Sequence, residues 1–155
     1  MRVLAADVGG TKTLLALANG GKRGDILHTL RMPSGDYDSI ESLISAFLTQ
    51  ISAGRESLDM ICLAVPGPVH GDLISLTNLP WEFSRQALGR HFSPARLEMI
   101  NDFQASAYGT LELAADEIVT LYDAPVRQDG RRVVLGAGTG LGMAWLETIA
   151  HRPYA

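Results

Sequence analysis

The chain opens with short apolar runs bounded by glycine. Residues 3–8 and 14–18 are almost continuously apolar, and only Gly9-Gly10-Thr11-Lys12-Thr13 lies between them. Apolar runs of this length are typical of buried strands, and so short a connection favours a hairpin. After a second glycine-rich turn, alternate positions predict a third strand, with one face made by Ile26, His28, Leu30 and Met32.

The next segment has the repeat of an amphipathic helix. Its apolar residues recur at intervals of three and four, in the order Ile40, Leu43, Ile44, Phe47, Leu48, Ile51. Asp38 is the expected N-cap, with Glu41 three residues later, and Gly54 is the expected stop.

Strands and helices then alternate along the chain. The pattern predicts further strands over 60–65, 73–77, 97–100, 118–122 and 133–135, and helices over 83–92 and 103–114. Pro66-Gly67-Pro68 fits neither kind of element. This order of elements predicts an α/β fold.

The chain also contains an internal similarity. Residues 4–17 and 132–145 both read as an apolar strand, a glycine-rich turn that includes Gly-Thr, and a second apolar strand. A fold that uses the same hairpin once in each of two domains would explain this. We therefore predict a first domain over residues 1–113 and the beginning of a second over 114–155.

Composition narrows the class of protein. The 155 residues are 46% hydrophobic and 19% charged, with a net charge of -4, so no basic surface is expected for nucleic acid. No stretch has the roughly 18–20 apolar residues of a membrane span, and no leader pattern precedes the first strand, so we expect a cytoplasmic protein. Cys62 is the single cysteine, which excludes an internal disulfide, and it is expected to be a buried hydrophobe.

The first candidate site is Asp7-Val8-Gly9-Gly10-Thr11. Glycines in a tight turn let backbone N–H groups converge on an anion, and Thr11 adds a hydroxyl donor. Asp7 would repel a phosphate unless a hydrated Mg²⁺ lay between them. The alternative is a hairpin whose glycines only satisfy turn geometry. The segment is neither a P-loop nor a dinucleotide fingerprint.

The second candidate site is Gly136-Ala137-Gly138-Thr139-Gly140-Leu141-Gly142. So many glycines between two apolar runs exceed what one tight turn requires. Two such loops in one chain favour a polyphosphate ligand.

The third candidate site is Asn101-Asp102, after the predicted strand 97–100 and before a helix. The carboxyl ends of strands are where ligands usually bind in α/β folds. Asp102 could take a proton from an alcohol as a general base. Taken alone, the residue favours the N-cap of the helix that follows, although one residue can do both.

Taken together, these segments resemble the bacterial glucokinases, which belong to the sugar kinase, actin and Hsp70 superfamily. The resemblance rests on the order and spacing of 7–11, 66–68, 76–81 (Leu-Thr-Asn-Leu-Pro-Trp), 100–103 and 136–142. It implies a ribonuclease H-like (actin-like ATPase) N-terminal domain of a two-domain sugar kinase.

The resemblance also implies a reaction, in which ATP with Mg²⁺ phosphorylates glucose or a related hexose at the 6-hydroxyl. Asn101 and Asp102 would bind the sugar, and Asp102 would be the catalytic base. Asp7 would hold the metal through water. The residues that would bind the cofactor are Ala6, Asp7, Val8, Gly9, Gly10, Thr11, Gly138 and Thr139.

Two departures from the family pattern matter. Lys12 and Leu14 stand where many members have Asn and Arg, and Gly-Gly-Thr-Lys is similar to the ROK group, so a non-catalytic ROK-type sugar-sensing module is the alternative. No helix-turn-helix pattern precedes the hairpin, which favours the kinase. The family's second sugar-binding stretch and adenine region are not in the 155 residues, so we expect an N-terminal portion that is inactive alone. Its apolar C-terminal strands would favour a homodimer.

Overall fold

The computed structural model describes residues 1–21, 25–76, 78–125, 130–137, 141–149 and 152–155. The chain forms two compact units, Met1–Asp102 and Phe103–Ala155, which are described separately. The domain boundary expected at residue 113 stays a prediction.

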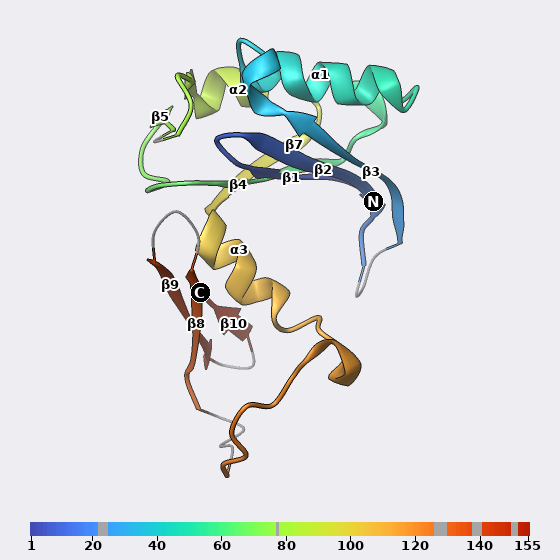
Figure 1. Ribbon diagram of the computed structural model, residues 1–155. Coiled ribbons are helices and arrows are strands. Elements are labelled where there is room, and N and C mark those ends of the chain that lie inside the picture. Colours follow the sequence, from blue (N-terminus) through green and yellow to red (C-terminus); the bar gives the residue numbers. More distant parts are fainter. Residues whose placement is uncertain (22–24, 77, 126–129, 138–140, 150–151) are drawn as a thin grey trace. The chain divides into compact units, whose positions relative to one another are not determined.

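The first unit is built on a five-stranded sheet in the order β3-β2-β1-β4-β7 (Figure 1). Its strands are β1 (Arg2–Val8), β2 (Lys12–Asn19), β3 (Ile26–Pro33), β4 (Met60–Val65) and β7 (Arg96–Asn101). β1, β2 and β3 pair in antiparallel fashion, whereas β4 runs parallel to β1, and β7 runs parallel to β4. The carboxyl ends of β1, β4 and β7 therefore meet at one edge of the sheet. All five strands, including the hairpin, were predicted from the sequence.

One face of this sheet carries the core. In β1 the side chains of Leu4, Ala6 and Val8 are buried, while the alternate positions are more exposed. Helices α1 (Ile40–Gln50) and α2 (Arg85–His91) lie on one side of the sheet (Figure 1). The predicted apolar stripe of α1 is buried in the same core cluster as β1 from Ile40 to Leu48, whereas Ile51 is the C-cap and is partly buried against that cluster. Each large aliphatic or aromatic side chain in such a core contributes about 1.5–3 kcal/mol through its burial.

The opposite face of the sheet mixes small, larger apolar and ionisable side chains, and one of its rows is Ala5, Cys62 and Glu98. Cys62 lies there and is only partly buried, whereas the sequence predicted a buried cysteine. Burial raises the pKa of its thiol, and the Glu98 carboxylate raises it further. The thiol is therefore kept protonated and poorly nucleophilic.

The caps of α1 differ from the prediction. The N-cap is Ser39 and not Asp38, because the Ser39 hydroxyl accepts a bond from the Ser42 backbone N–H, and the Ser39 backbone N–H donates to the Ser42 hydroxyl. The helix ends at Gln50, and the residue with positive φ after it is Ser52 (53°), so Gly54 is not the stop.

A small hairpin corrects the prediction between β4 and α2. β5 (Leu73–Ser75) is shorter than expected and pairs with β6 (Glu82–Ser84), which was not predicted. Phe83 therefore belongs to a strand, and α2 begins only at Arg85, capped by the Ser84 hydroxyl. Short apolar segments are ambiguous between strand and helix until a pairing partner is known.

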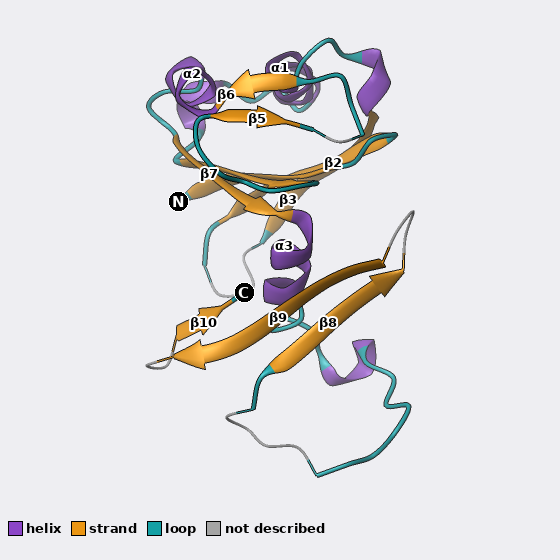
Figure 2. Cartoon of the chain, turned by 90° about the vertical axis from the view of Figure 1, so that its left-hand side faces the viewer, coloured by secondary structure: helices purple, strands orange, loops and turns teal. Residues whose placement is uncertain are grey.

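The second unit contains most of α3 (Asp102–Gly109) and a sheet in the order β10-β9-β8 (Figure 2). Its strands are β8 (Arg132–Ala137), β9 (Leu141–Ile149) and β10 (Arg152–Tyr154); β10 was not predicted. The helix ends at Gly109, earlier than the expected residue 114. The strand expected over 118–122 is absent from the described residues, and Leu121 is 95% exposed there. An apolar run without a partner strand cannot satisfy its backbone as a strand.

Candidate active site

The turn between β1 and β2 is held by close packing of its glycines. A Cβ added to Gly9 would lie 2.6 Å from the Lys12 carbonyl oxygen. A Cβ added to Gly10 would lie 2.6 Å from Asn78 Cβ and 3.0 Å from Asn78 O. Neither position has room for a side chain, because ordinary Cβ contacts are far longer. This turn, residues 9–11, is called the phosphate turn below.

The structure limits what the other residues predicted at this site can contribute. Ala6 and Val8 point their side chains into the core, so only their backbone groups could meet a ligand. Thr11 is exposed, and its carbonyl accepts a bond from the Ser34 backbone N–H at 3.1 Å.

Two polar residues that support the phosphate turn were missed in the sequence. Thr13 and Ser34 are both 0% exposed, and their hydroxyl oxygens lie 3.0 Å apart. The Ser34 hydroxyl donates to the Gly9 carbonyl at 2.7 Å. The available signal was Thr13 itself, a polar residue in the same alternation as the inward-facing Leu15 and Leu17.

Asp7 and Asp102 lie near one another where the parallel strands end. Asp7 pairs with Ala64, and Ala64 pairs with Ile100, so the three side chains form a row across β1, β4 and β7. Asp102 follows Ile100 by two residues. Although part of Asp7 reaches solvent, burial raises the pKa of its carboxyl, and the Asp102 carboxylate raises it further. The edge where the parallel strands end therefore concentrates negative charge.

Asn101 lies at the end of β7 and supports a neighbouring turn. Its Nδ2 donates to the Gly67 carbonyl at 3.0 Å, and Gly67 has a φ of 98°, which favours glycine. This bond ties Pro66-Gly67-Pro68 to the residue before Asp102. Asp102 itself is the first residue of α3, where a carboxylate is favourable at a helix N-terminus.

Asp7 suits a hydrated magnesium ion as one ligand among several. Within the described residues, no group of three or more His, Cys, Asp and Glu side chains could hold a metal unaided. Mg²⁺ keeps several waters and commonly binds through one or two carboxylates plus substrate phosphates. A single carboxylate beside the phosphate turn fits this kind of binding. It does not fit a site in which protein side chains alone surround the metal.

The second glycine-rich loop is explained in part by packing. Gly138 and Thr139 lie outside the described residues. A Cβ on Gly136 would lie 2.8 Å from the Phe103 ring, and one on Gly142 would overlap that ring. These two glycines are therefore needed to admit Phe103, and they do not by themselves indicate a phosphate ligand.

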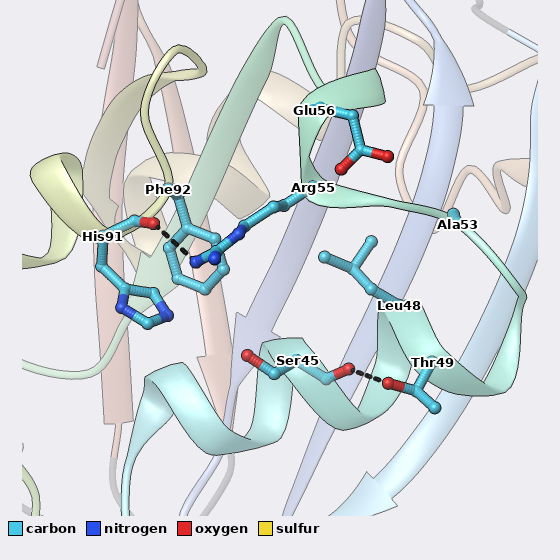
Figure 3. A pocket seen from close by; sticks show the side chains of 8 residues that line it. All are labelled: Ser45, Leu48, Thr49, Ala53, Arg55, Glu56, His91 and Phe92. Atoms are coloured by element: carbon cyan, nitrogen blue, oxygen red, sulfur yellow. Dashed lines mark hydrogen bonds between the residues drawn. The ribbon is translucent and has the colours of Figure 1, made fainter.

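A cavity of about 380 Å³ lies elsewhere in the first unit (Figure 3). Arg55 and His91 line it, and Arg55 Nη1 donates to the His91 carbonyl at 3.1 Å. Both residues precede the first residues of β4 and β7, at the opposite ends of these strands from Asp102. None of the residues predicted to bind substrate or cofactor lines this cavity, so it is separate from the candidate active site.

None of the described helices is long and apolar enough to cross a membrane.

Comparison with known proteins gives a consistent assignment. The glucokinase family matches residues 4–155. A glucokinase of Chromohalobacter salexigens is 38% identical over 144 residues, which cover 92% of this chain and 44% of that protein. The crystal structure of a glucokinase from an Antarctic psychrotroph has 31% identity and a TM-score of 0.86, covering 99% of this chain and 48% of that one.

A glucokinase from Balamuthia mandrillaris, solved in complex with glucose, has 26% identity and a TM-score of 0.69 over 99% of this chain and 46% of that one. The chain thus spans less than half the length of each of these proteins. The structural similarities confirm the expected sugar-kinase fold. On the family match over nearly its whole length, the chain belongs to the glucokinase family.

Proposed function

We propose that the protein to which this chain belongs transfers the γ-phosphoryl group of ATP to the 6-hydroxyl of glucose. One observation carries the proposal: Asp7, beside the phosphate turn, and Asp102 lie within electrostatic range at the edge where the parallel strands end. That arrangement provides a place for phosphate beside a base. Membership of the glucokinase family and the relative solved with glucose support the same substrates.

In this proposal the Asp102 carboxylate accepts the proton of the sugar 6-hydroxyl. At the same time the oxygen of that hydroxyl bonds to the γ-phosphorus. The bond between that phosphorus and the β,γ-bridging oxygen breaks, and ADP leaves. Backbone N–H groups of the phosphate turn hold phosphate oxygens, and Asn101 orients the sugar. Mg²⁺, held through water at Asp7, would neutralise phosphate charge. Most of the catalysis then comes from positioning and electrostatics.

The assignments of Gly138 and Thr139 to the phosphate site remain part of the proposal, as do a cytoplasmic location and a homodimer. An exposed apolar face of the β8–β9 sheet supports self-association. Val133 pairs with Trp145 and Leu135 with Met143, and all four side chains are more than half exposed.

The test uses the product of the complete reading frame that contains these residues. ADP release is measured with ATP and Mg²⁺, with and without glucose, and with mannose and fructose as competing hexoses. We expect glucose-dependent ADP release with glucose 6-phosphate as the product. A folded protein that binds glucose but releases no ADP would instead support the ROK-type sensing module.

A further inference from the structure

The segment that follows β3 contacts the phosphate turn through one buried residue. Ser34 is the first residue of η1 (Ser34–Asp36) and is fully buried. Its backbone N–H donates to Thr11 O at 3.1 Å, and its hydroxyl donates to Gly9 O at 2.7 Å. Both carbonyls that flank Gly10 in the turn are thus held by the same residue.

Counting protons fixes the direction of the remaining bond. A serine hydroxyl has one proton, and that of Ser34 is donated to Gly9 O. The 3.0 Å contact between the Thr13 and Ser34 hydroxyls must therefore be donated by Thr13. Thr13 in turn restrains the oxygen that orients the Gly9 carbonyl.

The bond to Gly9 also sets the direction of a neighbouring donor. In a planar trans peptide the C=O and the following N–H point in opposite directions. Because the Gly9 carbonyl points toward buried Ser34, the Gly10 N–H points the other way, away from Ser34. A backbone N–H aimed outward from a glycine turn is the kind of donor that binds a phosphate oxygen.

The same segment holds a second loop beside the turn. The carbonyl of Tyr37, the residue after η1, accepts a bond from Trp81 Nε1 at 3.1 Å. Trp81 is buried, and its own carbonyl accepts from Leu76 N at 3.1 Å, which closes the loop. Asn78 lies within that loop and is the residue in close contact with Gly10.

We propose that residues 34–37 form a brace that fixes the phosphate turn and the Asn78 loop in one arrangement, with Ser34 as a positioning residue for the phosphoryl donor. This inference rests on the proposed function, because it assumes that the turn binds the phosphates of a nucleotide. Ser34 touches no substrate in this view and acts through the Gly9–Gly10 peptide.

The test compares Ser34→Ala with a matched control, Ser57→Ala, in the product of the complete reading frame. Ser57 also donates its hydroxyl to a glycine carbonyl, that of Gly54, at 2.6 Å, and it lies at the opposite edge of the sheet. We expect Ser34→Ala to raise the KM for ATP at least about tenfold, since small displacements of bound groups reduce rates strongly. The KM for glucose and both constants of Ser57→Ala should change less than about threefold.

Thr13→Val and Thr13→Ser keep the inference testable if Ser34→Ala does not fold. Valine matches threonine in shape and removes the hydroxyl, whereas serine retains it, so only Thr13→Val should raise the KM for ATP. Unchanged ATP constants in the folded Ser34→Ala and Thr13→Val proteins would overturn the inference. Calorimetric titration with ADP provides a separate readout, because weaker ADP binding by Ser34→Ala would support the brace even if the unmodified protein did not phosphorylate glucose.

Discussion

The Asp102 carboxylate lies close enough to Asp7 for its charge to act on it, although β4 lies between β1, which carries Asp7, and β7, which ends one residue before Asp102. The row Asp7, Ala64, Ile100 across the sheet explains why. The alanine in the middle of this row puts only a small side chain between Asp7 and Ile100, which precedes Asp102 by two residues.

This relationship predicts how Asp7 titrates. Burial contributes most to the raised pKa of Asp7, and the Asp102 carboxylate contributes a further increase. Asp102→Asn removes that charge, so the pKa of Asp7 should move down toward 3.8 without reaching it. The measurement is the carboxyl ¹³C shift of Asp7 against pH in both proteins. An Asp7 titration that is identical in the two would contradict the placement of the carboxylates.

The same substitution tests the chemistry. In the full-length protein, Asp102→Asn should lower kcat by at least about 10²-fold with a much smaller change in KM, because the base is removed and its shape is kept. Asp59→Asn is the control, since Asp59 accepts a bond from Arg2 N at the far edge of the sheet. Near-normal turnover of Asp102→Asn would show that Asp102 is not the base and serves only at the N-terminus of α3.

Gly10→Ala should destabilise the fold as well as weaken ATP binding. The new Cβ would meet Asn78 at 2.6 Å, and such overpacking costs about 1–3 kcal/mol. Gly109→Ala is the matched control, because a Cβ there meets nothing within 4 Å. Thermal unfolding and the KM for ATP are compared in both variants. If Gly10→Ala matched Gly109→Ala in stability and kinetics, the contact with Asn78 would be unimportant.

The Asp72 carboxylate makes the stability of the first unit depend on pH. Bonds from the Gln86 backbone N–H and then from the Ser84 hydroxyl lower the pKa of Asp72 below 3.8. The folded-state pKa is the lower one, so the stabilisation is complete above the unfolded-state pKa and is lost as pH falls through the folded-state pKa. Asp72→Asn should therefore lower Tm at pH 7, and this difference should shrink toward about pH 2.5.

Asp116→Asn serves as the control for that measurement. The Asp116 side chain is exposed and makes no hydrogen bond with the residues that the structure describes. It should leave Tm unchanged at both pH values. A constant difference between Asp72→Asn and the unmodified chain across the pH range would contradict the assigned bonds.

The apolar face of β8 and β9 should make the 155-residue chain self-associate. Trp145, 64% exposed, pairs with Val133 on that face. Trp145→Lys should lower the mass measured by sedimentation, because a charge there opposes burial of the face. Val119→Lys changes an even more exposed apolar residue (82%) outside the sheet and should have no such effect. A monomeric unmodified chain would contradict the prediction.

Much of the first unit could be predicted because its signals are local. The hairpin of β1 and β2 and the stripe of α1 each need only periodicity over a dozen residues. Ser34 could not be found this way, since its role depends on contacts with residues far back along the chain. The short strand β6 was missed for the same reason, because its identity depends on pairing with β5.

The glycines show a different limit of sequence interpretation. Gly10 and Gly142 look alike in sequence, yet Gly10 packs against a loop and Gly142 against an aromatic ring. The glycines in a sequence indicate where a side chain would not fit, but they do not show which neighbouring group occupies the space.

The ring of Phe103 between Gly136 and Gly142 also constrains the order in which these positions can change. A side chain at Gly142 overlaps the ring, so the substitution is blocked while Phe103 is present. Replacing Phe103 first by a small residue opens the space, after which alanine at 142 becomes acceptable. The effects of the two substitutions are therefore strongly non-additive. A side chain at residue 142 therefore becomes acceptable only after residue 103 has changed.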